Sequence, residues 1–171
     1  VLLRKHRAYA EVYNDLDDQV VNLFRVLQDE GRAARLAQLL ELTPFARTEF
    51  ETAWDFTDEP VEKARRLIVR SFMGFGSNAH SDMGRGHKTT GFRASSSRSG
   101  TTPAHDWANY PSSLPAIIAR MRGVIIERRP AIQVMQQHDG LSTLHYVDPP
   151  YLPETRNRRN PHDPKHQYRH E

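Results

Sequence analysis

The tetrapeptide Asp148-Pro149-Pro150-Tyr151 sets an acid and an aromatic ring on either side of two prolines. The apolar residues just before it are typical of a buried strand, and two prolines end a strand because they remove two backbone donors. They also fix the backbone direction, so that the carboxylate and the Pro149 carbonyl are two acceptors facing one point. Such a pair suits an amino group, and the Tyr151 ring suits stacking on a planar base. The alternative is a strand-ending turn with a surface tyrosine.

A second acid, Asp15, follows a short strand-like stretch over residues 8–12. An acid at the end of an early strand commonly accepts hydrogen bonds from ribose hydroxyls. The sequence "NDLDD" would serve equally well as a turn or a helix cap, so both interpretations stay open at this point. A helix is predicted to begin at Asp17 or Asp18, because acids in a first turn suit the positive end of the helix dipole.

The remaining elements must bring these two acids together. Helical spacing alternates with apolar strands, and a parallel sheet flanked by helices is the economical arrangement for that order. Residues 74–102 are rich in Gly, Ser, Thr and Arg and predict a long loop. The other expected features are a helix end at Gly31 and helix starts at Thr43-Pro44, Pro60, Ser113 and Pro130, the last helix running through Ile132 and Met135. Strands are expected over 124–127 and 144–148.

Composition limits the classes of protein that fit. A chain of 171 residues is long enough for one domain with a core. The balance of 24 Lys+Arg against 21 Asp+Glu is compatible with a nucleic-acid partner but does not require one. No cysteine is present, which excludes disulfides and thiolate metal sites. No apolar run approaches the roughly 20 residues of a membrane span, so we expect no membrane partner and a cytoplasmic location.

These motifs together resemble a known family. "DPPY" after an apolar strand, with "AEVYNDLD" and a helix of the type "VVNLF" far upstream, is similar to the Dam-like N6-adenine DNA methyltransferases. The resemblance implies transfer of a methyl group from S-adenosylmethionine to the amino group of an adenine flipped out of double-stranded DNA. It also implies an α/β fold: part of a Rossmann-like, methyltransferase-type parallel sheet flanked by helices, with a helical and loop insert that recognises the target.

The resemblance assigns roles to residues at both acidic sites. Asp148 and the Pro149 carbonyl would accept the two hydrogens of the adenine amino group, and Tyr151 would stack on the base. Asp15 would hold the cofactor ribose, and Leu16 would pack near the cofactor adenine. This chemistry needs no metal. The implied catalytic residues are therefore Asp148, Pro149, Pro150 and Tyr151, and the implied cofactor residues are Asp15 and Leu16.

The same resemblance predicts the organisation of the chain and its contacts with DNA. Residues 1–171 would be one incomplete methyltransferase domain, with the recognition insert over 44–115 and the catalytic part over 116–171. Phe75 and Phe92 would wedge against bases. The basic residues expected to contact DNA are Arg85, Lys88, Arg93, Arg98, Arg156, Arg158 and Arg159.

Two features of the family are missing from the sequence. The family begins with a strand and a Phe-x-Gly-Gly loop for the methionine part of the cofactor, and further strands follow its catalytic loop. We therefore expect a complementing chain or a homo-oligomer as a partner. The alternatives are a DNA-binding module without catalysis, or the same chemistry on cytosine N4 or a protein amide. A metal site is a minor alternative for three histidines that recur every four residues, His162, His166 and His170.

Overall fold

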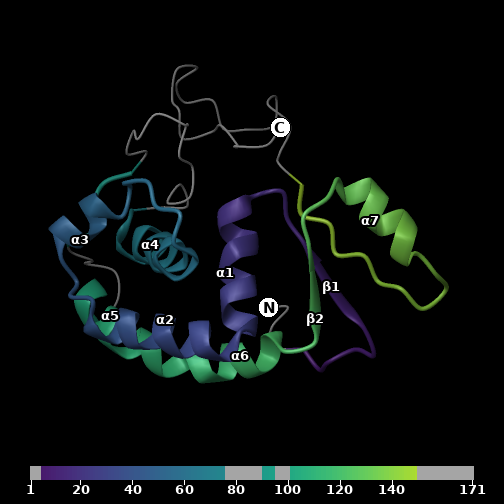
Figure 1. The fold of residues 1–171 in the computed structure, drawn as a ribbon, viewed down its shortest axis with the longest axis horizontal. Helices are drawn as coiled ribbons and strands as arrows, with labels where there is room; N and C mark the ends of the chain where they lie inside the picture. The colour runs from purple at the N-terminus through teal and green to yellow at the C-terminus, as the bar shows by residue number, and fades with distance from the viewer. Residues whose placement is uncertain (1–4, 76–89, 95–100, 150–171) are drawn as a thin grey trace, which may run out of the picture.

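The computed structural model describes residues 5–75, 90–94 and 101–149. It has a mixed α/β architecture, in which a small parallel sheet lies beside a larger group of helices (Figure 1). The prediction of an α/β fold with a parallel sheet flanked by helices is confirmed at this level. The sheet in the described residues has two strands, fewer than the sequence pattern predicted.

The sheet consists of β1 (Glu11–Asn14) and β2 (Val124–Glu127), which pair in parallel. Val12 lies opposite Ile125 in the register. The strand expected over residues 8–12 thus begins three residues later and ends two residues later in the chain, whereas the strand expected over 124–127 is confirmed. The described residues between the two strands form helices and loops, so the connection is a long crossover of the kind that parallel pairing requires.

The first two helices are α1 (Asp18–Gln28) and α2 (Glu30–Leu42). Asp17 caps α1 through its side chain, which confirms the predicted helix start. The prediction that Gly31 ends this helix is wrong, because Gly31 lies in the first turn of α2. The boundary is set instead by Asp29, whose carboxylate accepts from the backbone at the start of α2.

The predicted helix start at Thr43-Pro44 is also wrong. Thr43 is buried at the end of α2, where its Oγ1 donates to the Leu39 carbonyl over 2.7 Å. The same hydroxyl accepts from Arg65, so it is not available to cap a helix that follows. The short α3 (Arg47–Thr52) therefore begins later and has no side-chain cap.

The next helix, α4 (Pro60–Met73), has proline in its first turn and Glu59 as its cap, which confirms the start predicted at Pro60. The helix α5 (Pro103–Asn109) was not predicted from the sequence. Thr102 caps α5, and Trp107 is the residue that α5 buries most deeply after Pro103.

A short 3-10 turn over Tyr110–Ser113 leads into α6 (Leu114–Met121), close to the start predicted at Ser113. The last helix, α7 (Ala131–His138), follows Pro130 as predicted. The helix runs through Ile132 and Met135 as expected; its buried residue is Val134, and Ile132 is 63% exposed.

The hydrophobic core lies among the helices and not on the sheet. α1 packs against α4 and α2, and α6 packs against α1. α1 also lies against the sheet, where the Phe24 ring meets the Tyr13 ring edge-on with centroids 4.5 Å apart. Figure 1 shows α7 on the other side of the strands from α1. The most deeply buried large side chains of the core are Val26, Leu36, Leu40, Phe50, Val69, Met73 and Leu114.

The strand expected over residues 144–148 is not formed. No helix or strand is assigned within residues 139–149, and three of their apolar side chains are exposed: Leu144 by 88%, Tyr146 by 68% and Val147 by 56%. A strand needs a neighbouring strand for its backbone hydrogen bonds, and none of the described residues provides one here. The residue types favour a strand, but no strand in the described part of the chain pairs with this segment.

Candidate active site

The site predicted around Asp15 lies at the carboxyl end of β1. The backbone N–H of Asp15 donates to the Glu127 carbonyl over 3.3 Å, so this residue continues the ladder one step beyond the strand. Asp15 is half-buried and Leu16 is 42% exposed. An acid at the end of a parallel strand is therefore present, followed directly by the start of α1.

Both oxygens of the Asp15 carboxylate are held by neighbours. Oδ2 accepts from the Tyr13 hydroxyl over 3.0 Å, and Oδ1 accepts from the Asp17 backbone N–H over 2.9 Å. The cap of α1 is Asp17 and not Asp15, so the turn and cap roles proposed for "NDLDD" divide between the two acids. Because each carboxylate oxygen can accept more than one hydrogen bond, Asp15 retains acceptor capacity in a fixed orientation.

Tyr13 is a site residue that the sequence analysis missed. Its ring is covered by α1, and its hydroxyl reaches Asp15 two positions along the strand. Burial, together with the adjacent Asp15 charge, raises the pKa of the Tyr13 phenol well above its ordinary value. Tyr13 therefore stays protonated at neutral pH and acts as a donor to Asp15. The signal was the spacing of two, which puts residues 13 and 15 on one face of a strand.

Two arginines that follow β2 fix the loop after β1. Arg128 donates from Nη1 to Asp18 Oδ1 over 2.7 Å and from Nε to the Leu16 carbonyl over 3.3 Å. Arg129 and Asn14 bond reciprocally, since the Arg129 N–H donates to Asn14 Oδ1 over 3.0 Å and Asn14 Nδ2 donates to the Arg129 carbonyl over 2.9 Å. These contacts join the two strand ends into one rim. The sequence analysis assigned no role to either arginine.

Asp148 and Pro149 are both exposed and follow a segment without regular structure. Figure 1 shows that this segment ends on the side of the molecule where the carboxyl ends of β1 and β2 lie. No contact links Asp148 to Asp15 among the hydrogen bonds and ion pairs of the described residues. The structure thus brings Asp15 and Leu16 together with the rim arginines but does not join them to Asp148. Pro150 and Tyr151 lie outside the described residues.

The predicted DNA contacts are described only in part. Arg93 lies with its Nη2 3.8 Å from Asp106 Oδ2, and its backbone N–H donates to the Met73 carbonyl. Phe75 is 72% exposed, as a wedge residue would have to be. The basic residues Arg85, Lys88, Arg98, Arg156, Arg158 and Arg159 lie outside the described residues, as do the three histidines of the metal alternative.

The Phe92 ring is turned toward the helices, contrary to the prediction that it wedges against bases. It packs on Phe45 and Phe50, with ring centroids 5.1 and 5.9 Å away. An antiparallel bridge between Gly74 and Phe92 holds it there. The site for a Cβ at Gly74 lies 2.6 Å from the Arg70 carbonyl, which explains why this bridge is built on a glycine.

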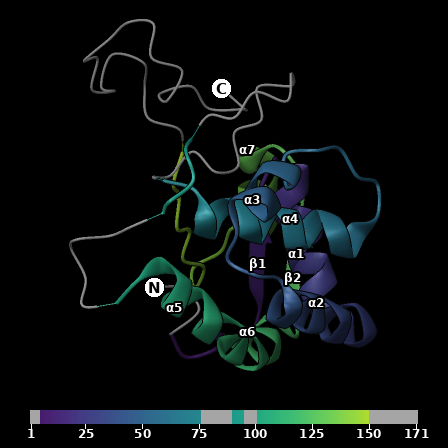
Figure 2. The ribbon, with the colours of Figure 1, turned by 90° about the vertical axis from the view of Figure 1, so that its left-hand side faces the viewer.

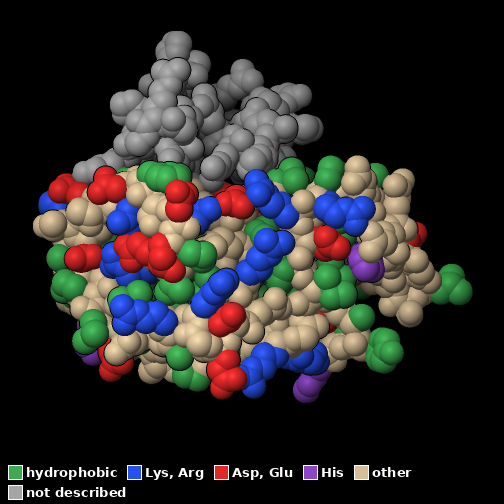
Figure 3. All heavy atoms as spheres, viewed as in Figure 1, with side chains coloured by type: hydrophobic (Ala, Val, Ile, Leu, Met, Phe, Trp, Pro, Cys, Tyr) green, Lys and Arg blue, Asp and Glu red, His purple; other side chains and the backbone are tan. Residues whose placement is uncertain are grey.

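The surface of the described residues shows no concentration of positive charge on the face in Figure 3, where Lys and Arg are interspersed with Asp and Glu. Within residues 5–75, 90–94 and 101–149 no group of three or more His, Cys, Asp or Glu side chains is placed to hold a metal ion. None of the helices described there is both long and apolar enough to cross a membrane.

The chain was compared with protein-family models, curated proteins and solved structures, and none of them matches it.

Proposed function

We propose that this chain is the central part of an S-adenosylmethionine-dependent methyltransferase that acts on the N6 amino group of adenine in double-stranded DNA. The observation that carries the proposal is the oriented Asp15 carboxylate at the carboxyl end of a parallel strand. Ligands of open α/β sheets bind beyond the carboxyl ends of the strands. The DPPY sequence, with its acid and ring beside two prolines, would supply the chemistry in this proposal.

In this proposal, Asp15 accepts hydrogen bonds from the ribose hydroxyls of the cofactor. Tyr13 and the Asp17 backbone keep the carboxylate from rotating, so that little orientation is lost on binding. Leu16 is exposed beside it and offers an apolar surface to the cofactor adenine. S-adenosylmethionine would supply the electrophilic methyl group.

Asp148 and the Pro149 carbonyl accept the two hydrogens of the target amino group in this proposal, which directs the nitrogen lone pair towards the methyl donor. The exposure of Asp148 is compatible with a residue that meets its substrate only when the base has been flipped. Tyr151 would stack on that base. Most of the rate enhancement would come from holding the two substrates in line.

Calorimetry with S-adenosylmethionine tests the cofactor half, with Asp15→Asn as the main variant. Asparagine keeps an acceptor for the Asp17 N–H but loses the charge, so we expect affinity to fall by about tenfold or more. Asp139→Asn is the matched control, because Asp139 is an exposed acid after α7. Equal affinity in wild type and Asp15→Asn, or no binding by either, would contradict the cofactor assignment.

Methyl transfer to duplex DNA tests the catalytic half. Asp148→Ala should abolish transfer while leaving cofactor binding unchanged, because Asp148 touches only the base in this proposal. A second candidate, a DNA-binding module without catalysis, is favoured by the missing strand at 144–148. DNA binding by wild type without cofactor binding or methyl transfer would select that candidate.

A further inference from the structure

Arg128 reaches across the end of the sheet to the loop that carries Asp15. It follows β2 directly, and β1 and β2 lie side by side in parallel, so the residues after the two strands lie at one end of the sheet (Figure 2). Its Nε donates to the carbonyl of Leu16, the residue next to Asp15, over 3.3 Å. Arg128 therefore lies beside both residues that the proposed function assigns to the cofactor.

The guanidinium of Arg128 is held in one orientation. Besides the bond from Nε to Leu16, Nη1 donates to Asp18 Oδ1 over 2.7 Å, at the start of α1. The group is planar, so bonds from two different nitrogens fix its plane as well as its position. Nη2 carries two further N–H donors in that plane and has no hydrogen-bond partner among the described residues. The side chain is 48% exposed, so a ligand can approach it.

Arg128 shares its carboxylate partner with a second cation. Asp18 Oδ2 accepts from Nζ of Lys63, a residue of α4, while Asp18 Oδ1 accepts from Arg128. One carboxylate thus serves two cations, and the guanidinium remains a charged donor towards a further partner. Hydrogen bonds from charged donors are shorter and stronger than those from neutral ones.

The donors that remain on Arg128 require a partner that accepts, because arginine has no acceptor of its own. The adenine ring of S-adenosylmethionine is the part that the proposed function puts against Leu16, and its ring nitrogens N1, N3 and N7 are all acceptors. The methionine part joins the ribose through C5′, away from the carbon that bears the adenine. The part of the cofactor within reach of Arg128 is therefore the adenine ring.

We propose that Arg128 recognises the adenine ring of the cofactor by donating a hydrogen bond from Nη2 to a ring nitrogen. The inference rests on the proposed function, because it takes Asp15 and Leu16 as the ribose and adenine contacts. It adds a residue from the second strand to the cofactor site. The alternative is that Arg128 acts only as a clamp on the loop after β1.

Calorimetry on the 171-residue chain tests the inference, with S-adenosylhomocysteine and its 1-deaza, 3-deaza and 7-deaza analogues as ligands. Each analogue replaces one ring nitrogen by a CH group and so removes one acceptor. Wild type should bind one analogue about tenfold or more weakly than the parent compound, because a hydrogen bond from a charged donor is lost. Arg128→Met should bind the parent about tenfold or more weakly than wild type does, and should bind that analogue and the parent equally well.

Two further variants make the result specific. Arg35→Met is the matched control, because it removes an equal charge from an exposed position on α2, and it should discriminate between the ligands as wild type does. Arg128→Lys covers the case in which Arg128→Met does not fold, since its ammonium group can still pair with Asp18. It should also lose the discrimination, because lysine has one nitrogen in place of the planar fork.

Four results would overturn the inference. If Arg128→Met weakened binding of the parent and the analogues by one factor and kept the discrimination, Arg128 would be a clamp only. Equal affinity of wild type for all four ligands would exclude a ring contact. Unchanged ligand affinity in Arg128→Met with weaker binding of duplex DNA would assign Arg128 to a DNA phosphate. If wild type bound no ligand, the proposed function would fail with the inference, whereas binding weakened by Asp15→Asn but not by Arg128→Met would overturn the inference alone.

Discussion

The helical body and the carboxyl-terminal segment use similar residue types with opposite results. The helical body, α1 to α6, fully buries leucines and aromatic rings such as Leu36, Leu40 and Phe50. The carboxyl-terminal segment, residues 139–149, carries leucine, tyrosine and valine in exposed positions. The difference lies in the backbone: a helix satisfies its own hydrogen bonds, whereas a strand depends on a neighbour. Apolar sequence alone therefore orders the first region and not the second.

The largest expected effect on the free energy of unfolding comes from replacing a leucine by alanine in each of the two regions. Leu40 is fully buried in the core and Leu144 is 88% exposed. Leu40→Ala should lower the free energy of unfolding by about 2–5 kcal/mol, because it removes buried methyl groups and leaves a cavity. Leu144→Ala should change it by less than about 0.5 kcal/mol. Urea unfolding measures both, and a similar cost at the two positions would show that the comparison is wrong.

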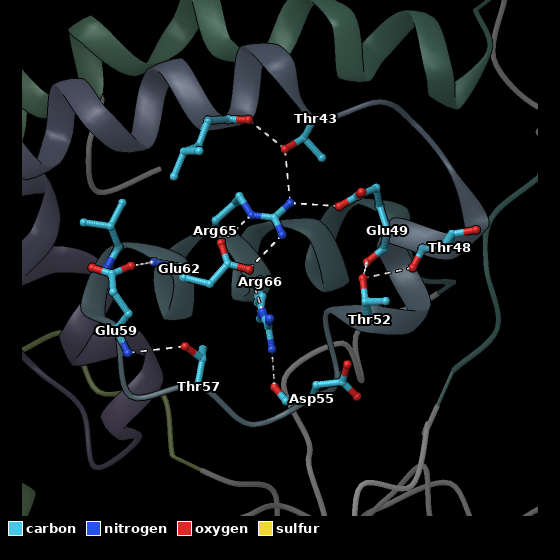
Figure 4. Close-up of polar contacts among 12 residues, drawn as sticks. Thr43, Thr48, Glu49, Thr52, Asp55, Thr57, Glu59, Glu62, Arg65 and Arg66 are labelled. Atoms are coloured by element: carbon cyan, nitrogen blue, oxygen red, sulfur yellow. Dashed lines mark hydrogen bonds and ion pairs between the residues drawn. The ribbon is translucent and has the colours of Figure 1, made fainter.

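The next effect concerns the polar network that joins helices in the helical body. Arg65 of α4 donates to Glu62 from Nε and Nη2, and to Glu49 and Thr43 from Nη1 (Figure 4). Arg65 holds the pKa of the Glu62 carboxyl below its usual value. Arg65→Met should cost about 2 kcal/mol of unfolding free energy, because several partners lose a charged donor in a largely buried place.

Arg32→Met is the matched control for that network. The Arg32 Nε lies 3.9 Å from Asp29 Oδ2, and both side chains are about half exposed. An exposed pair of this kind contributes at most about 0.5 kcal/mol. If both variants lost the same stability in urea unfolding, the network would hold the helices no better than a surface ion pair does.

A smaller effect is the pH dependence of stability that arises at the amino end of the sheet. Arg120 donates to both oxygens of the Glu11 carboxylate, and Lys5 donates to one of them. These contacts lower the pKa of Glu11 from 4.5 to about 2. Between these values the unfolded chain binds more protons than the folded one, so the stabilisation is present above pH 4.5 and is lost as the pH falls towards 2.

Glu11→Gln tests this pH dependence. The variant should be less stable than wild type at pH 7, and the two should converge as the pH is lowered from 4.5 towards 2, in thermal unfolding monitored by circular dichroism. Glu51→Gln is a suitable comparison from an exposed position on α3. A constant difference between wild type and Glu11→Gln over the whole range would exclude the lowered pKa as the cause.

Local signals predicted the starts of helices that depend only on nearby residues. Asp17 and Pro60 act within one turn of their own helices, and both starts are where the sequence predicted them. Thr43 and Gly31 misled for a physical reason, since a distant arginine engages the hydroxyl of Thr43 and Asp29 ends the helix before Gly31 is reached. Local sequence does not show which distant partner claims a hydroxyl.

The candidate site divides in the same way. Asp15 and Leu16 were predicted from a strand followed by an acid, and this pattern is local. Tyr13 was within reach of the same reasoning, through its spacing from Asp15 on one face of the strand. Arg128 was not, because it reaches the loop after β1 from more than a hundred residues away in the chain. The location of Phe92 also depends on a distant pairing, with Gly74.

The smallest expected effect compares two tyrosines, Tyr13 at the sheet and Tyr110 in the helical body. Burial raises the pKa of both phenols, but only Tyr13 has a carboxylate partner. Above pH 10 the unfolded chain releases phenol protons that the folded chain retains, so stability is lost as the pH rises. Tyr13→Phe and Tyr110→Phe should both weaken this alkaline loss, measured by urea unfolding between neutral pH and pH 11.

At neutral pH the two variants should differ. Tyr13→Phe leaves Asp15 Oδ2 without its donor and should cost about 1 kcal/mol, whereas Tyr110→Phe removes a hydroxyl with no such partner and should cost less. If Asp15 also binds the cofactor as proposed, Tyr13→Phe should weaken that binding and Tyr110→Phe should not. Equal effects of both variants on cofactor affinity would mean that Tyr13 acts through packing alone, because orientation of Asp15 is the one role that Tyr110 does not share.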